Sequence, residues 1–187
     1  MTSDGRWADE MIDETVVTAE EIAAAVERLG REITRDYQGK KLLVIGILRG
    51  ASLFMADLIR RIELPLVIDF ISVSSYGAET KSSGVVRILK DLAVPLSGYD
   101  ALFVEDIVDT GLTWAYLRQI FEARQPASLR ICALLDKPAA RKIPVTVDYC
   151  GFSIGDKFVV GYGLDLKEQY RNLPFIVTPK LARRAAE

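Results

Sequence analysis

The sequence is dominated by short apolar runs that alternate with amphipathic stretches. Continuous apolar runs and helical periodicities follow one another at residues 42–48, 52–62, 66–73, 101–104, 112–123 and 129–135. Runs that are apolar on both faces are typical of buried parallel strands, and alternation of strand and helix favours an α/β fold. We therefore expect an open, mostly parallel twisted sheet flanked by helices, with ligands at the carboxyl ends of its strands.

Local signals place further elements before and within this region. Thr18 and Glu21 form a capping box for a helix that continues to about residue 37. A polar, glycine-bearing stretch at 74–84 predicts a long loop, and a short extended run is expected at 85–89.

The chain ends in shorter pieces that indicate a cap over the sheet. Strand-like patterns occur at 145–152, 158–160 and 175–177. No repeat, low-complexity tract or linker divides the sequence, so we predict a single domain over residues 1–187. Its core is expected at about 38–145, and a small hood is expected from about 1–37 and 146–187.

The composition narrows the class of protein. The chain has 24 Lys or Arg and 26 Asp or Glu, a formal charge of −2, which disfavours extended nucleic-acid binding. Its two cysteines, Cys132 and Cys150, are too few for a disulfide framework. The N-terminus lacks the apolar segment of a signal peptide, and no apolar run approaches the about 20 residues that span a bilayer. We expect a cytoplasmic protein that binds neither nucleic acid nor membrane.

Three carboxylates follow the apolar run at 101–104. Glu105 and Asp106 are adjacent, and Asp109 comes three residues later. Carboxylates that share the end of a buried strand repel one another and are costly to desolvate, so they usually have partners such as sugar hydroxyls or a divalent metal. The alternative is that Asp109 or Thr110 caps a helix while Glu105 and Asp106 are solvated loop acids.

A helix is expected to begin directly after these acids. The backbone amides of residues 109–113, the hydroxyls of Thr110 and Thr113, and the unobstructed backbone of Gly111 suit a bound monophosphate. A phosphate cradle beside acids that bind hydroxyls predicts a site for a ribose 5-phosphate.

The stretch at 104–113 resembles the phosphoribosyl-pyrophosphate signature of the type I phosphoribosyltransferases throughout. Other segments narrow the resemblance to the hypoxanthine-guanine branch, over about residues 42–174. The resemblance implies the type I phosphoribosyltransferase fold, in which Glu105 and Asp106 approach the ribose hydroxyls and the shell of a metal. The residues implied to hold the 5-phosphate are Asp109, Thr110, Gly111, Leu112 and Thr113.

Two further segments are implied to bind pyrophosphate. The loop at 46–51 is similar to the pyrophosphate loop of this branch, in which Gly50 lets a phosphate approach the backbone and Arg49 adds charge and donors. Arg171 matches a family arginine that also binds pyrophosphate. Taken alone, 46–51 would be an ordinary βα turn with a solvated arginine. The peptide before Arg49 is commonly cis in the family, which a sequence does not reveal.

Ser75 and Tyr76, in the polar loop, are similar to the mobile lid of these enzymes. A lid would exclude the water that could capture the cationic ribose C1 as pyrophosphate leaves. The alternative is a plain solvent loop.

The base pocket is implied by two segments near the C-terminus. Lys137 matches the family lysine that contacts the purine 6-oxygen, and an ammonium, which only donates, suits a 6-oxopurine better than adenine. Phe158 would stack on the base, and the carbonyl of Val159 would lie near the purine 2-position. The Asp165 carboxylate would join a magnesium shell, so the implied metal residues are Glu105, Asp106 and Asp165. Read alone, Lys137 would be a surface cation, and Phe158 and Val159 would be plain core residues.

The implied reaction transfers the 5-phosphoribosyl group from phosphoribosyl pyrophosphate to N9 of hypoxanthine, guanine or both. Mg²⁺ is the expected cofactor, because it offsets the charge of pyrophosphate. Asp109 is the candidate catalytic residue, which would exchange a proton with N7 of the base. The chain contains no histidine, which leaves a carboxylate for this role. Family members are commonly homodimers or homotetramers.

Other classes of function fit the sequence less well. No Gly-x-Gly-x-x-Gly or Gly-x4-Gly-Lys-Ser/Thr motif supports a dinucleotide-binding oxidoreductase or a nucleotide triphosphatase. A regulator of the same fold that binds RNA or a sugar phosphate without catalysis would be expected to lose Asp109 or Lys137 and to gain a basic face. An enzyme of the fold that acts on orotate, uracil or adenine is a third alternative, which Lys137 and Phe158 disfavour.

Overall fold

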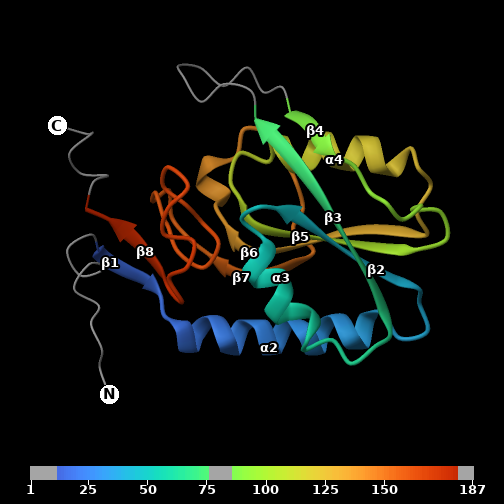
Figure 1. Cartoon of the computed structure of the whole chain (residues 1–187), viewed down its shortest axis with the longest axis horizontal. Helices are drawn as coiled ribbons and strands as arrows, with labels where there is room; N and C mark the ends of the chain where they lie inside the picture. The colour runs from blue at the N-terminus through green and yellow to red at the C-terminus, as the bar shows by residue number, and fades with distance from the viewer. Residues whose placement is uncertain (1–11, 76–85, 181–187) are drawn as a thin grey trace.

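The computed structural model describes residues 12–75 and 86–180. Its main sheet has the strand order β4-β3-β2-β5-β6-β7 (Figure 1). Neighbouring strands pair in parallel, except for β4, which pairs antiparallel with β3. This confirms the predicted open, mostly parallel sheet. The strands are β2 (Leu42–Leu48), β3 (Leu66–Ser75), β4 (Val86–Lys90), β5 (Asp100–Val108), β6 (Ser128–Asp136) and β7 (Tyr149–Ser153).

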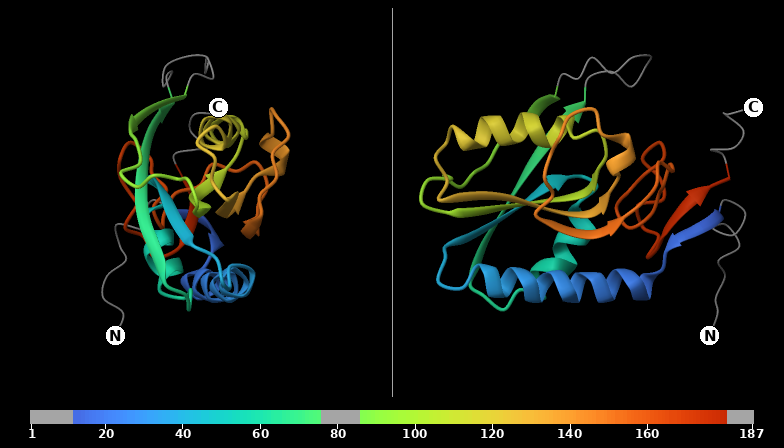
Figure 2. Two further views of the ribbon diagram at one scale, coloured as in Figure 1. Left: turned by 90° about the vertical axis from the view of Figure 1, so that its right-hand side faces the viewer. Right: turned by 180° about the vertical axis from the view of Figure 1, so that it is seen from behind.

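Helices cover both faces of this sheet (Figure 2). Leu102 packs in the apolar core that contains the buried residues of α2 and α3. Its neighbour Phe103 points to the other face and contacts Trp114 and Phe121 of α4, with ring centroids 5.4 and 5.0 Å apart. The alternation along β5 therefore supplies two separate cores. The helices are α2 (Ala19–Asp36), α3 (Ser52–Ile59) and α4 (Leu112–Glu122).

The capping box at the start of α2 is confirmed. The Thr18 amide donates to Glu21 Oε2 (2.8 Å), and the Glu21 amide donates to Thr18 Oγ1 (3.2 Å). α3 ends at Ile59, earlier than the predicted 52–62, because the last residues form a tighter turn in which the Ile62 amide donates to the Ile59 carbonyl. No helix in the described parts of the chain could cross a membrane.

A separate two-stranded sheet brings the two ends of the described chain together. β1 (Ile12–Val17) pairs antiparallel with β8 (Ile176–Pro179), at one end of the main sheet (Figure 1). The predicted strand at 158–160 is wrong: Val160 forms only an isolated bridge with Val177.

The predicted boundaries of the hood also differ from the structure. β7 lies within 146–187 but pairs in parallel with β6 and extends the main sheet. α2 lies within 1–37 but packs its buried face into the core beneath that sheet. The periodicity of β7 does not distinguish a strand of the main sheet from one of a cap, because both are apolar and short.

Candidate active site

The first two acids of the motif lie inside β5. The predicted strand end at residue 104 is wrong, because pairing with β6 continues to Val108 opposite Asp136. Adjacent residues of a strand point to opposite faces of a sheet. Asp106 lies against Gly50, where a Cβ atom would come within 1.7 Å of Asp106 Oδ2. Glu105 instead lines a cavity of about 20 Å³ beside α4, which is large enough for one water molecule.

Both acids are poorly solvated. Burial, together with the charges of Asp106 and Asp109, raises the pKa of Glu105 well above its ordinary value. Within residues 12–75 and 86–180, Glu105 Oε2 is enclosed and has no hydrogen-bond partner. Burial also raises the pKa of Asp106 to about 6, although the Ile107 amide and the charge of Arg171 oppose this rise. Such groups are the desolvated carboxylates that functional sites favour.

The predicted phosphate cradle forms the junction of β5 and α4. Gly111 caps α4 with a left-handed φ of 80°, which glycine adopts without steric cost. The Thr110 amide donates to the carboxylate of Asp109, and the Leu112 amide lies 3.4 Å from Thr110 Oγ1. The amides at 109–113 therefore surround a helix N-terminus, which is a suitable place for a phosphate.

The residues predicted to bind pyrophosphate lie on two loops that meet. The peptide bond between Leu48 and Arg49 is cis. A Cβ atom on Gly163 would come within 2.0 Å of the Gly50 carbonyl, so the loop after β2 packs directly on the loop around Gly163. Arg171 Nη1 donates to the Gly163 carbonyl (2.6 Å), which places this arginine beside the same contact.

Glu168 links the charges of these two loops, and Asp165 pairs with Arg171 within one of them. Arg171 Nη2 lies 2.8 Å from Asp165 Oδ1 and 3.2 Å from Glu168 Oε2. Glu168 also pairs with Arg49, whose Nη1 lies 3.1 Å from Oε2. The predicted residues Arg49, Asp165 and Arg171 are thus brought together by Glu168, which the sequence reasoning did not identify.

The predicted base pocket adjoins the acid motif. Lys137 follows β6, and its amide donates to the Val108 carbonyl (2.9 Å), so it directly neighbours the cradle. Its side chain is buried, and its Nζ donates to the Lys157 carbonyl. This contact brings Lys137 to the segment that carries Phe158 and Val159. Phe158 is 49% exposed, whereas Val159 is buried in the core.

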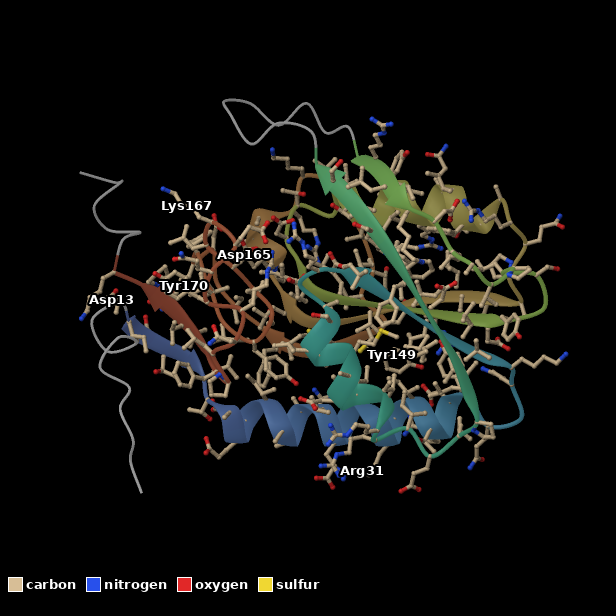
Figure 3. All side chains as sticks on the ribbon, viewed as in Figure 1. Asp13, Arg31, Tyr149, Asp165, Lys167 and Tyr170 are labelled. Atoms are coloured by element: carbon tan, nitrogen blue, oxygen red, sulfur yellow. The ribbon has the colours of Figure 1, made fainter. Side chains whose placement is uncertain are left out.

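Ser75 ends β3, but its side chain and the whole of Tyr76 lie outside the described residues, so the predicted lid does too. Arg141 was not identified from the sequence, although it donates to the carbonyls of Val108 and Asp109. Its only sequence signal is its position four residues after Lys137. Figure 3 labels Asp165, Lys167 and Tyr170 in the loops between β7 and β8.

Known proteins match this chain over most of its length. The family model described as a phosphoribosyl transferase domain matches residues 14–167. The hypoxanthine-guanine phosphoribosyltransferase of Bacillus subtilis (strain 168) is 50% identical over 165 residues, which cover 88% of this chain and 92% of that protein. The enzyme of the same name from Staphylococcus aureus (strain Mu50) is 47% identical over 169 residues, covering 90% and 94%. A crystal structure of a hypoxanthine phosphoribosyltransferase from Staphylococcus aureus has a TM-score of 0.92 at 44% identity, covering 97% of this chain and 98% of that one.

Proposed function

The chain belongs to the phosphoribosyl transferase family, and we propose that its purine-salvage reaction takes place where β5 and β6 end side by side. The reaction transfers the 5-phosphoribosyl group from phosphoribosyl pyrophosphate to N9 of hypoxanthine or guanine and releases pyrophosphate. The observation that carries the location is the 2.9 Å hydrogen bond from the Lys137 amide to the Val108 carbonyl. It joins a phosphate cradle to a cation that selects a purine oxygen.

The ribose 5-phosphate is proposed to bind at the start of α4. The amides of residues 109–113 and the hydroxyls of Thr110 and Thr113 would hold the 5-phosphate, because a helix N-terminus favours an anion. Glu105 and Asp106 would approach the ribose hydroxyls. The two acids point to opposite faces of the sheet, Asp106 toward Gly50 and Glu105 toward the cavity beside α4.

The base is proposed to bind between Lys137 and Phe158. The Lys137 ammonium donates hydrogen bonds and accepts none, so it favours the 6-oxygen of hypoxanthine or guanine over the 6-amino group of adenine. The exposed ring of Phe158 is available for stacking on the purine. The buried Val159 would contribute its backbone carbonyl rather than its side chain.

Asp109 is proposed as the catalytic residue. Its carboxylate is exposed at the cradle and already accepts a hydrogen bond from the Thr110 amide. Accepting or sharing the N7 proton would raise the electron density of the purine ring, so that N9 attacks ribose C1 more readily.

The leaving pyrophosphate is proposed to contact Arg49, the backbone at Gly50, and Arg171. Arginine supplies planar paired donors that match phosphate oxygens. The absence of a side chain at Gly50 lets an anion approach the backbone beside Asp106.

The donor set at this edge fits Mg²⁺. Within the described parts of the chain, no three or more His, Cys, Asp or Glu side chains are close enough to hold a metal on their own. Mg²⁺ usually takes one or two protein carboxylates and completes its shell with water and substrate phosphates. We propose that Asp106 and Asp165 supply the carboxylates of this shell. Glu105 is proposed to lie closer to the ribose. When bound, Mg²⁺ would neutralise part of the charge on pyrophosphate.

Assembly and location are also part of the proposal. Large apolar side chains are exposed on α3, β3 and β4, namely Leu53 (40%), Ile68 (45%) and Leu89 (62%). The assembly is proposed from the family resemblance, as a homodimer or homotetramer. The two free cysteines support a reducing, cytoplasmic location.

A substrate panel tests the proposed function. The protein is incubated with phosphoribosyl pyrophosphate, Mg²⁺ and one of five bases: hypoxanthine, guanine, xanthine, adenine or uracil. Nucleotide and pyrophosphate are expected with hypoxanthine, guanine or both, and none with adenine or uracil. No product with either 6-oxopurine would instead favour the non-catalytic regulator.

A further inference from the structure

The loop proposed to hold the 5-phosphate is hydrogen-bonded to residues 137–143. The Val108 carbonyl accepts a hydrogen bond from the Lys137 amide (2.9 Å). The Thr110 carbonyl accepts from two amides of the same segment, at 3.0 and 3.3 Å. The carbonyls at both ends of the stretch from Val108 to Thr110 are therefore held by the segment at 137–143.

Arg141 binds the middle of this stretch. Its Nη1 donates to the Val108 carbonyl (2.8 Å) and to the Asp109 carbonyl, while its Nη2 donates to the carboxylate of Asp136. The side chains of Arg141 and Asp136 are only 16% and 18% exposed. A guanidinium presents five donors in a rigid plane, so one side chain can hold two carbonyls and a carboxylate at once.

Fixing these carbonyls also fixes the amides of the cradle. In a planar trans peptide the C=O and N–H bonds point in opposite directions. When Arg141 binds the carbonyls of Val108 and Asp109, the amides of Asp109 and Thr110 turn toward the opposite side, where the 5-phosphate is expected. The Thr110 amide faces that side in the structure, where it donates to the Asp109 carboxylate.

The same arginine connects the cradle to the base pocket. Asp136 is the last residue of β6 and directly precedes Lys137. Because Arg141 is bonded both to Asp136 and to the backbone at 108–109, it fixes the end of β6 relative to the end of β5. On the basis of the proposed function, we propose that Arg141 is a positioning residue that orients the 5-phosphate cradle and fixes Asp109 relative to Lys137.

Two ligands that each probe one part of the site separate this role from a general effect on folding. Ribose 5-phosphate probes the cradle, and Mg²⁺-pyrophosphate probes Arg49 and Arg171. Arg141→Ala should weaken ribose 5-phosphate binding about 10-fold or more and lower kcat about 10- to 100-fold, since small misplacements of reacting groups are costly. The dissociation constant for pyrophosphate should change less than about twofold. Both constants are measured by titration calorimetry on the full chain.

A conservative variant and a matched control sharpen the test. Arg141→Lys keeps the charge but should not restore ribose 5-phosphate binding, because an ammonium is a compact donor that does not span three acceptors. Arg118→Ala removes an arginine that lines the same groove as Arg141 but pairs only with Glu122 among the described residues. It should leave both dissociation constants and kcat unchanged.

The outcomes distinguish the inference from the proposed function. Wild-type affinity for ribose 5-phosphate in a folded Arg141 variant would overturn the positioning role. Equal losses for ribose 5-phosphate and pyrophosphate would overturn it too, since they would indicate general disruption. If Arg141→Ala does not fold, Arg141→Lys and Asp136→Asn provide the same comparison. A wild-type protein that binds ribose 5-phosphate but forms no nucleotide would contradict the proposed function and leave the role of Arg141 standing.

Discussion

The carboxylate of Glu168 pairs with Arg49, which lies on a different loop, directly after β2. Arg49 Nη1 lies 3.1 Å from Oε2, and Nη2 donates to Oε1 at 3.3 Å. The same carboxylate lies 3.2 Å from Arg171. Glu168 and its neighbour Lys167 have positive φ angles of 65° and 52°, which are uncommon for residues other than glycine. A strained loop thus places one carboxylate on both cations proposed to bind pyrophosphate.

Replacing this carboxylate should strengthen pyrophosphate binding. Pyrophosphate must displace Glu168 from Arg49 and Arg171, so Glu168→Gln should lower its dissociation constant about two- to fivefold, the range expected for exposed ion pairs. Glu27→Gln is the control, because Glu27 pairs with Arg31 on the exposed face of α2. Weaker binding in Glu168→Gln would show that Glu168 orients the arginines rather than competing with the ligand.

Asp109→Asn should lower kcat for nucleotide formation about 10²- to 10⁴-fold. Asparagine keeps the size of the side chain and an oxygen that can accept from the Thr110 amide, but it does not take a proton at neutral pH. Steady-state turnover and the dissociation constant for ribose 5-phosphate are measured together. Retention of most of the wild-type turnover would remove Asp109 from the catalytic role.

Lys137→Gln should reduce selection for 6-oxopurines. A side-chain amide can both donate and accept, and the loss of a charged hydrogen bond should lower kcat/KM for hypoxanthine about 10- to 100-fold. The readout is the ratio of kcat/KM for hypoxanthine to that for adenine, which should fall. Lys41→Gln is the control, because Lys41 directly precedes β2 and so lies at the amino ends of the strands, away from the site. An unchanged ratio would mean that Lys137 does not contact the purine 6-oxygen.

Asp69 should stabilise the fold in a pH-dependent way. It is 7% exposed, and its carboxylate accepts from the backbone amides of Phe70, Ala93 and Val94. Burial alone would raise the pKa of Asp69, but these amides and Lys90 outweigh burial and lower it below 3.8. Because the folded pKa lies below the unfolded one, the stabilisation is complete above pH 3.8 and is lost as the pH falls through the folded pKa.

Chemical denaturation of Asp69→Asn tests this directly. The free energy of unfolding should fall by about 1–3 kcal/mol at neutral pH, because asparagine places an NH₂ group where amides donate. The difference from wild type should shrink as the pH is lowered below 3.8. A difference that is constant from neutral to acidic pH would show that the charge of Asp69 contributes nothing.

Local sequence patterns predicted the features that are determined by residues close together in the sequence. The capping box of Thr18 and Glu21 is confirmed, and α4 begins at Leu112 as predicted. The end of β5 was predicted too early, because polar acids at 105–106 interrupt the apolar run although the strand continues. That error concealed the opposite orientations of Glu105 and Asp106.

Contacts between distant residues could not be predicted in this way. Glu168 meets Arg49 across 119 positions of sequence, and Arg141 meets Val108 across 33. Neither acid nor arginine has a distinctive local signal, because charged residues in loops are ordinarily solvated. The folding of β7 into the main sheet depends equally on long-range pairing with β6.

We propose one site, at the ends of β5 and β6, for both the phosphoribosyl group and a 6-oxopurine. A crystal structure of the protein with inosine monophosphate, Mg²⁺ and pyrophosphate tests it most directly. We expect the 5-phosphate within hydrogen-bond distance of the amides at 109–113 and the purine 6-oxygen within hydrogen-bond distance of Lys137 Nζ. A nucleotide bound with its phosphate away from those amides and its base away from Lys137 would rule out this shared site.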